Sequence, residues 1–176
     1  GAISGVDRGA ADSHQEWLQD RSDRVSVFAL LREMVEELGV APDGLGGLTE
    51  VKEQIRAEVC ADKANWLRLM ESGTLTCEGF HCEMITERVT PPQAPARFHN
   101  LFFHVPTGEP GVTPSFPPGR SEFDEFRWWR PADLIASWEN NEIRLPPPLV
   151  TLARDLVEAI ENEGDLQAAC DALAAD

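Results

Sequence analysis

The sequence predicts a compact α/β domain, because segments with helical periodicity flank two segments with strand periodicity. Apolar residues within 24–38, 51–59 and 149–160 recur every three or four positions, as on one face of a helix. Residues 84–90 alternate apolar and polar side chains, and 97–105 form a largely apolar run, as strands do. With 176 residues, 42% of them hydrophobic, the chain can bury the core of one domain.

The charge balance excludes whole classes of partner. Fifteen Lys and Arg against thirty-one Asp and Glu give a net charge of −16. Such a surface repels nucleic-acid phosphates, and no basic stripe offsets it, so we expect no nucleic acid polymer as partner. The sequence contains no apolar run long enough to span a membrane. A small phosphate-bearing substrate would need metal ions and a few well-placed arginines.

The first 31 residues lead into the main helix. Residues 1–12 are rich in Gly, Ala and Asp and are predicted to form a loop. Residues 13–21 show a short helical pattern with Trp17 and Leu18, interpreted as a lid. Ser22 or Asp23 is the expected N-cap of the next helix.

That helix ends in Arg32–Val40, the most informative stretch of the chain. At 100° per residue, Glu33, Glu36 and Glu37 share one narrow face. Like charges three or four residues apart cost about 0.2–0.5 kcal/mol each in an exposed helix. A divalent cation would turn this repulsion into attraction, because hard cations prefer carboxylate oxygens. Gly39 supplies the left-handed residue that ends a helix. The opposite face carries the predicted core residues Val27, Leu31, Met34, Val35 and Leu38.

The nine residues Arg32–Val40 resemble the second half of the Nudix box, R-E-U-x-E-E-x-G-U with U a bulky aliphatic residue. Gly1 and Asp7 have the spacing of its first half, G-x5-E, with Asp in place of Glu. Residues 8–31 separate the halves by twenty-four positions, where the family usually has seven. A subset that resembles coenzyme A pyrophosphatases carries such an insertion.

The resemblance implies a Nudix-type α/β/α sandwich around a mixed β-sheet, as a single domain over 1–176. The family's opening strands normally precede Gly1, so the sheet is expected to lack its N-terminal strands. An exposed sheet edge of this kind favours a homodimer or aggregation.

The resemblance also implies a metal site for Mg²⁺ or Mn²⁺. Glu36 and Glu37 are expected as ligands, and Glu33 as a third ligand or as the base that acts on a water. Arg32 would orient a neighbouring carboxylate, and the carbonyl of Gly1 is a candidate backbone ligand. The expected catalytic residues are therefore Arg32, Glu33 and Glu36.

Residues 41–48 contain one proline and three glycines and are predicted to form a loop. Residues 49–73 are expected to be a helical insertion of two helices, capped by Thr49 and Asp62 and ended by Gly73. Packing is its expected role, and covering the substrate is the alternative.

The two strands carry a second match to the family. Thr90-Pro91-Pro92, Arg97-Phe98 and Phe102-Phe103 resemble the T-P-x(n)-R-F-x-x-x-F-F signature of the coenzyme A-type subset. Arg97 is a candidate for binding a substrate phosphate. A salt bridge at the strand edge is the alternative.

Residues 106–120 form a predicted Pro/Gly loop, and Phe126 and Trp128 mark a predicted strand after it. This region is similar to the family's E-x-x-E-x-x-W strand, which implies an additional acidic metal ligand or base. Glu122 is favoured over Glu125 because it precedes the strand, and an exposed carboxylate is the alternative for both. Residues 131–176 are expected to be C-terminal helices. They resemble the Nudix part of bacterial proteins that continue into a metallo-β-lactamase-like domain.

The four cysteines form no C-x-x-C pair. Free thiols in a reducing compartment such as the cytoplasm are expected, with a soft-metal site at Cys77 and Cys82 as the alternative.

The function predicted is a metal-dependent Nudix pyrophosphohydrolase. It would cleave the diphosphate of a nucleoside diphosphate linked to another moiety, with coenzyme A or acyl-coenzyme A favoured on resemblance. Nucleoside diphosphate sugars, dinucleoside polyphosphates and oxidised nucleotides stay open. The alternative is a non-catalytic Nudix-like binding or accessory module.

Overall fold

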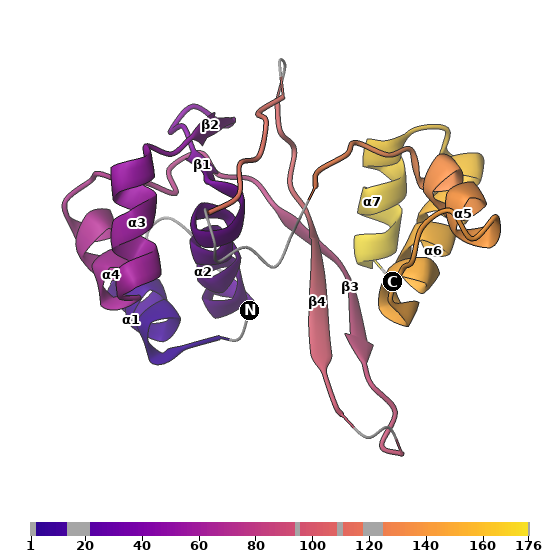
Figure 1. Cartoon of the computed structure of the whole chain (residues 1–176), viewed down its shortest axis with the longest axis horizontal. Helices are drawn as coiled ribbons and strands as arrows, with labels where there is room; N and C mark the ends of the chain where they lie inside the picture. Colours follow the sequence, from indigo (N-terminus) through magenta and orange to yellow (C-terminus); the bar gives the residue numbers. More distant parts are fainter. Residues whose placement is uncertain (1–2, 14–21, 94–95, 109–110, 118–124, 176) are drawn as a thin grey trace. The chain divides into compact units, whose positions relative to one another are not determined.

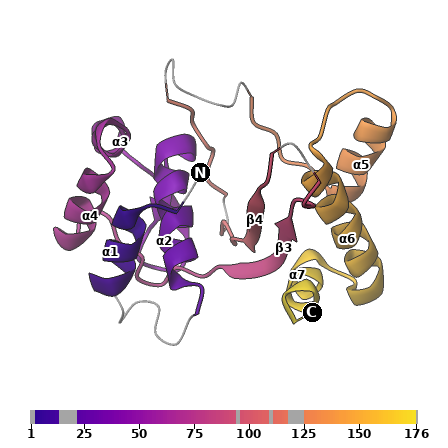
Figure 2. The same cartoon turned by 90° about the horizontal axis from the view of Figure 1, so that it is seen from below.

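The chain folds into two compact units, Gly1–His81 with Pro106–Phe126, and Cys82–Val105 with Arg127–Asp176. This computed structural model describes residues 3–13, 22–93, 96–108, 111–117 and 125–175. The predicted lid residues Trp17 and Leu18 lie outside the described residues. Figures 1 and 2 give two views of the chain.

The first unit opens with helix α1, Gly5–Ser13, where the composition had predicted a loop. Ser4 and Asp7 explain the difference. The Ser4 backbone N–H donates to Asp7 Oδ2 at 2.7 Å, and the Asp7 N–H donates to Ser4 Oγ at 3.4 Å. This reciprocal capping box stabilises the first turn of a helix despite two glycines. The loop prediction was wrong because it weighed composition above the cap.

The box helix comprises α2, Arg24–Glu33, and a π-helical last turn, η2, Met34–Leu38. Asp23 precedes it as the N-cap, as one of the two residues predicted. Gly39 ends it with φ of 65°, confirming the predicted left-handed stop. The π turn was not predicted, and such turns are common at functional sites. Most of the predicted apolar face is buried, namely Val27, Leu31, Met34 and Val35, whereas Leu38 is half-buried.

Two short strands and two helices complete the first unit (Figure 1). β1, Val40–Pro42, pairs antiparallel with β2, Leu48–Glu50, so the predicted 41–48 loop is shorter than expected. α3 spans Glu53–Ala61 and α4 spans Ala64–Glu71. Thr49 lies in β2 and does not cap α3, whereas Asp62 Oδ1 does accept from the Ala64 N–H at 2.9 Å. α1 packs on α2 and α4, and α3 packs on η2.

The second unit is built on an antiparallel hairpin, whose two strands lie where the strand periodicity predicted strands. β3, Glu83–Val89, pairs with β4, His99–His104, with an irregularity in register between Met84 and Thr86. Three helices follow: α5, Pro131–Glu139, α6, Pro147–Glu163, and α7, Leu166–Ala175. α6 packs on α5 and α7, and α7 packs on β3. The predicted helix starts at Pro131 and after Pro146 are confirmed.

The strands differ from the single mixed sheet that was expected. The described strands form two separate antiparallel pairs, β1–β2 and β3–β4. Parallel neighbours need a long crossover, whereas each of these pairs is joined by a short connection. The strand predicted around Phe126 and Trp128 is also not observed in its described part, since 125–130 has no regular structure. Alternating aromatic residues favour an extended chain but cannot specify a laddered neighbour.

All four cysteines lie in the described part of the chain. Cys77, Cys82 and Cys170 are buried and Cys60 is half-buried, and none of them forms a disulfide. Among the described residues, no helix is both long and apolar enough to cross a membrane.

Candidate active site

Arg32 is the centre of a buried charge network in the first unit. Its guanidinium is fully buried and contacts three carboxylates. Nε donates to Asp7 Oδ1 at 2.8 Å and Nη2 to Asp7 Oδ2 at 3.2 Å, a two-pronged contact. Nη1 lies 2.8 Å from Glu33 Oε1 and 2.8 Å from Glu36 Oε2. Arg32 therefore contacts three carboxylates, two of them on its own helix end.

Asp7 and Arg32 bring the two halves of the predicted motif together. Both are fully buried, although twenty-four residues of sequence separate them. Burial alone would raise the pKa of Asp7, but hydrogen bonds from Arg32 and Ser4 outweigh it and hold that pKa below its ordinary value. The pKa of Arg32 is raised in turn: burial opposes its charge, but Asp7, Glu36 and Glu33 favour it more strongly. Asp in place of Glu thus still makes the buried pair.

Glu36 and Glu37 each carry a buried carboxylate oxygen without a partner. Glu36 Oε1 and Glu37 Oε2 are two of the three buried side-chain polar atoms that find no hydrogen bond among the described residues, the third being Trp66 Nε1. Burial raises the pKa of Glu36, while the charges of Arg32 and Lys63 partly lower it and Glu33 raises it again. Buried anionic oxygens without donors are costly. A cation beside these two oxygens would relieve that cost.

The two carboxylates line a cavity of about 150 Å³ together with Cys60, Lys63 and Pro117. Cys60 Sγ lies 3.8 Å from the Glu36 carbonyl oxygen. Three separate segments therefore build the cavity: the end of the box helix, the α3–α4 insertion and the loop near Pro117. The sequence prediction had given the insertion a packing role, with covering the substrate as the alternative.

A second buried arginine fixes the backbone of this site. Arg56 is 1% exposed, and its Nε donates to the Glu36 carbonyl oxygen at 3.1 Å. Its Nη2 donates to the carbonyls of Glu37 at 3.2 Å and Ser115 at 2.7 Å. Its Nη1 donates to Ser115 Oγ at 3.1 Å, and the Ser115 N–H donates to the Leu38 carbonyl at 2.8 Å. In the described part of the chain the buried charged residues are Asp7, Arg32, Glu36 and Arg56, and all four belong to this network.

The oxygens of Glu36 and Glu37 are of the type that a hard divalent cation prefers, but they are not part of a cluster of three or more ligands in the described ranges. Carboxylate oxygens are the ligands that Mg²⁺ and Mn²⁺ prefer, and Glu36 and Glu37 each offer one with no competing donor. No cluster of three or more His, Cys, Asp or Glu within the described ranges is arranged to hold a metal. A Mg²⁺ site commonly uses only one or two carboxylates, completed by water and substrate oxygens. Two carboxylates without partners are therefore enough for such a site.

The other predicted site residues are not brought into this network. Arg97 is exposed, lies in the second unit ahead of β4 and forms no ion pair with a described residue. Its role as phosphate ligand stays a prediction. Glu125 is exposed, and the favoured Glu122 and the candidate backbone ligand Gly1 lie outside the described residues.

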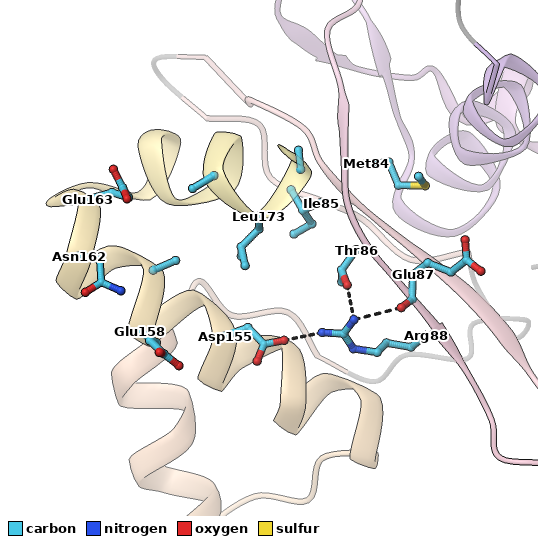
Figure 3. Close-up of a pocket in the computed structure, with 13 residues that line it drawn as sticks. Met84, Ile85, Thr86, Glu87, Arg88, Asp155, Glu158, Asn162, Glu163 and Leu173 are labelled. Carbon is cyan, nitrogen blue, oxygen red and sulfur yellow. Dashed lines mark hydrogen bonds and ion pairs between the residues drawn. The ribbon is translucent and has the colours of Figure 1, made fainter. Parts of the chain in front are cut away.

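Two cavities larger than the one at the carboxylates lie in the second unit. One, of about 720 Å³, lies beside β4 and the start of α6. The other, of about 750 Å³, lies between β3, α6 and α7. Figure 3 shows Arg88 on β3 in contact with Asp155 on α6, with Glu158, Asn162 and Glu163 on the same helix wall. Charged groups here are exposed or already paired, so we place the chemistry at the smaller cavity.

The fold was compared with those of solved proteins. The structure is similar to the crystal structure of a NUDIX hydrolase from Alicyclobacillus acidocaldarius, with a TM-score of 0.71 and 21% sequence identity. The similarity covers 90% of this chain and 73% of that chain. The fold is that of a Nudix hydrolase. No protein-family model matches the sequence, and no curated protein matches it. The coenzyme A-type subset is not addressed by this likeness.

The sequence analysis located the box helix of this Nudix fold but did not predict the residues that surround it. Arg56, Cys60, Lys63, Ser115 and Pro117 were not singled out. Arg56 and Cys60 are four residues apart on α3 and so share a helix face. That spacing was the available indication that α3 turns a functional face toward the box. Ser115 and Pro117 lie in a loop, where no periodicity could reveal them.

Proposed function

We propose that this chain is a metal-dependent Nudix hydrolase that cleaves the pyrophosphate bond of a nucleoside diphosphate linked to another moiety. The observation that carries the proposal is the pair of buried, unpartnered oxygens of Glu36 and Glu37. They lie next to Arg32, which already contacts Glu33 and the other carboxylate oxygen of Glu36. The fold likeness supports the same class. Fold alone would not, since one fold hosts many functions.

Glu36 and Glu37 would hold Mg²⁺ or Mn²⁺ through these oxygens. When bound, such a cation supplies charge neutralisation at the diphosphate oxygens and lowers the pKa of a water. Occupancy would also relieve the cost of leaving two anionic oxygens buried without donors. The net charge of −16 makes a cation the more necessary for an anionic substrate.

Glu33 is the residue we propose as general base. Its side chain is 21% exposed, more than the side chains of Asp7 and Glu36, which also contact Arg32, and Arg32 Nη1 lies 2.8 Å from its Oε1. The water oxygen forms a bond to one phosphorus, the bridging P–O bond breaks, and the water proton passes to Glu33. Arg32 restricts the rotamers of Glu33 and Glu36, so both are positioned before substrate arrives.

Coenzyme A or an acyl-coenzyme A is the substrate we propose within this class. The support is the sequence signature that runs through Arg97, Phe98, Phe102 and Phe103. Arg97 is exposed and so accessible to a phosphate. Cleavage of a panel that includes coenzyme A, ADP-ribose and a dinucleoside polyphosphate would identify the substrate class.

Glu37→Gln tests the site. The change removes one anionic oxygen but keeps the side-chain shape, so we expect metal-dependent cleavage to fall by more than about 100-fold with the helix still folded. Glu71→Gln, at an exposed position at the end of α4, is the matched control and should retain full activity. Phosphate release with and without Mn²⁺ is the measurement, and full activity in Glu37→Gln would refute the assignment.

The second candidate is a non-catalytic Nudix-like module. One observation favours it: no three His, Cys, Asp or Glu side chains in the described part of the chain are arranged so that they could hold a metal ion. Titration with Mn²⁺ separates the two functions. Binding together with cleavage supports the enzyme, whereas no binding at millimolar Mn²⁺ and no cleavage supports the module.

A further inference from the structure

Arg56 joins three segments of the first unit at one point. It projects from α3 of the helical insertion and is 1% exposed. Its guanidinium donates to the backbone carbonyls of Glu36 and Glu37 and to both oxygens of Ser115. Two of the three contacted carbonyls belong to Glu36 and Glu37, the residues that carry the unpartnered carboxylate oxygens.

The surroundings leave this guanidinium little freedom. Gly39 has φ of 65°, and a Cβ built there would lie 2.7 Å from Ser115 Oγ and 3.0 Å from Arg56 Nη1. The Ser115 N–H also donates to Leu38, the last residue of η2. Loop, glycine and arginine therefore pack closely around the end of the box helix.

The acceptors of Arg56 are mainly uncharged. Its nearest carboxylate, Glu53 Oε2, is 4.0 Å away and 63% exposed. A buried guanidinium is usually matched by a carboxylate, and Arg32 in the same unit has three. Arg56 instead uses its planar fork on carbonyls that end a helix, where the partial negative charge of the helix dipole favours a cation.

From these contacts we infer that Arg56 is a positioning residue of the hydrolase site. It sets where Glu36 and Glu37 present their carboxylates, and it holds the loop of Ser115 and Pro117 as the facing wall of the cavity. This inference rests on the proposed function. It gives the helical insertion a direct part in building the site, beyond packing or covering it.

The test compares three variants of the whole chain. Arg56→Lys keeps the charge but loses the fork that reaches several carbonyls at once. Val59→Ala removes buried methyl groups from the same helix and leaves the hydrogen bonds of Arg56 in place, so it controls for lost stability. Arg68→Lys, on α4 with its side chain 59% exposed, controls for the substitution itself. Mn²⁺ dissociation constants, kcat and KM are measured at a temperature where all variants are folded by circular dichroism.

We expect Arg56→Lys to weaken Mn²⁺ binding and lower kcat by about 10- to 100-fold, with a smaller change in KM. Val59→Ala and Arg68→Lys should stay within about twofold of the wild type in all three constants. An active wild type with Arg56→Lys no different from Val59→Ala overturns the inference and leaves the proposed function intact. A wild type that neither binds Mn²⁺ nor cleaves any diphosphate overturns the proposed function, and the inference with it.

Discussion

Arg32 and Arg56 are both buried in the first unit, yet they are stabilised in opposite ways. Arg32 contacts the carboxylates of Asp7, Glu33 and Glu36, so charge meets charge. Arg56 contacts backbone carbonyls of Glu36, Glu37 and Ser115, so charge meets dipoles. The comparison shows two separate tasks at one site: Arg32 orients side chains, and Arg56 fixes the backbone from which those side chains extend.

The largest effect on stability should come from Arg32→Ala. It leaves Asp7 and Glu36 buried without their cation, and breaking a buried pair in this way costs about 3–5 kcal/mol. Arg56→Ala should cost less, about 1–3 kcal/mol, because the groups left behind are uncharged carbonyls. Urea unfolding measures both. A larger loss for Arg56→Ala would reverse the comparison.

Asp7→Asn tests, through the pH dependence of stability, whether Arg32 is stabilised by the charge of its carboxylate partners. The pKa of Asp7 is lowered in the folded chain, so its contribution to stability is present above the unfolded pKa of about 4 and is lost as pH falls through the folded value. We expect the variant to be about 2–3 kcal/mol less stable at pH 7. The gap between wild type and variant should narrow below pH 4 in unfolding curves. A gap independent of pH would mean that Asp7 does not act through its charge.

Gly39→Ala tests the backbone half. Alanine with positive φ costs about 1–2 kcal/mol, and its Cβ would also press on Ser115 Oγ at 2.7 Å and Arg56 Nη1 at 3.0 Å. Gly73→Ala is the matched control, with φ of 69° and nothing within 4 Å of the added Cβ. Thermal melts should show Gly39→Ala about 1 kcal/mol worse than Gly73→Ala. Equal losses would show that the Arg56–Ser115 contact yields without cost.

The smallest effect is expected for Arg68→Ala. Its ion pair with Glu58, at 2.5 Å, is 59% and 46% exposed. Exposed pairs contribute about 0–1 kcal/mol, so the free energy of unfolding should change by less than that. High salt screens an exposed pair, so the difference between the wild type and Arg68→Ala should shrink further there. A large loss would indicate that burial is not what separates the effects of Arg32 and Arg56 from those of other arginines.

The two arginines also mark how far the sequence leads. Arg32 and its carboxylates are close in sequence and on one helix end, so spacing and a motif were enough to predict them. Asp7 was predicted only as a motif position, and its helix was missed because composition outweighed the Ser4 cap. Arg56 acts through backbone carbonyls of distant residues. Carbonyls are common to every residue type, so no pattern of letters identifies them as partners.

The strands show the same limit. The alternation in 84–90 predicted β3 because it depends on local burial. The mixed sheet could not be derived from alternation, since parallel pairing depends on segments far apart in sequence. The predicted strand at Phe126 failed for the same reason.

The contact between Asp7 and Arg32 closes a loop whose length can be weighed. Closure entropy rises as (3/2)RT ln n, so lengthening the connection from about seven residues to twenty-four costs about 1 kcal/mol. The loss expected from Asp7→Asn, about 2–3 kcal/mol, is larger than this cost. A motif can therefore be split by a long insertion and still assemble, provided that the residues at the two ends of the gap bind each other. The length of the connection then has little effect on the free energy of folding, and its sequence can serve a separate role.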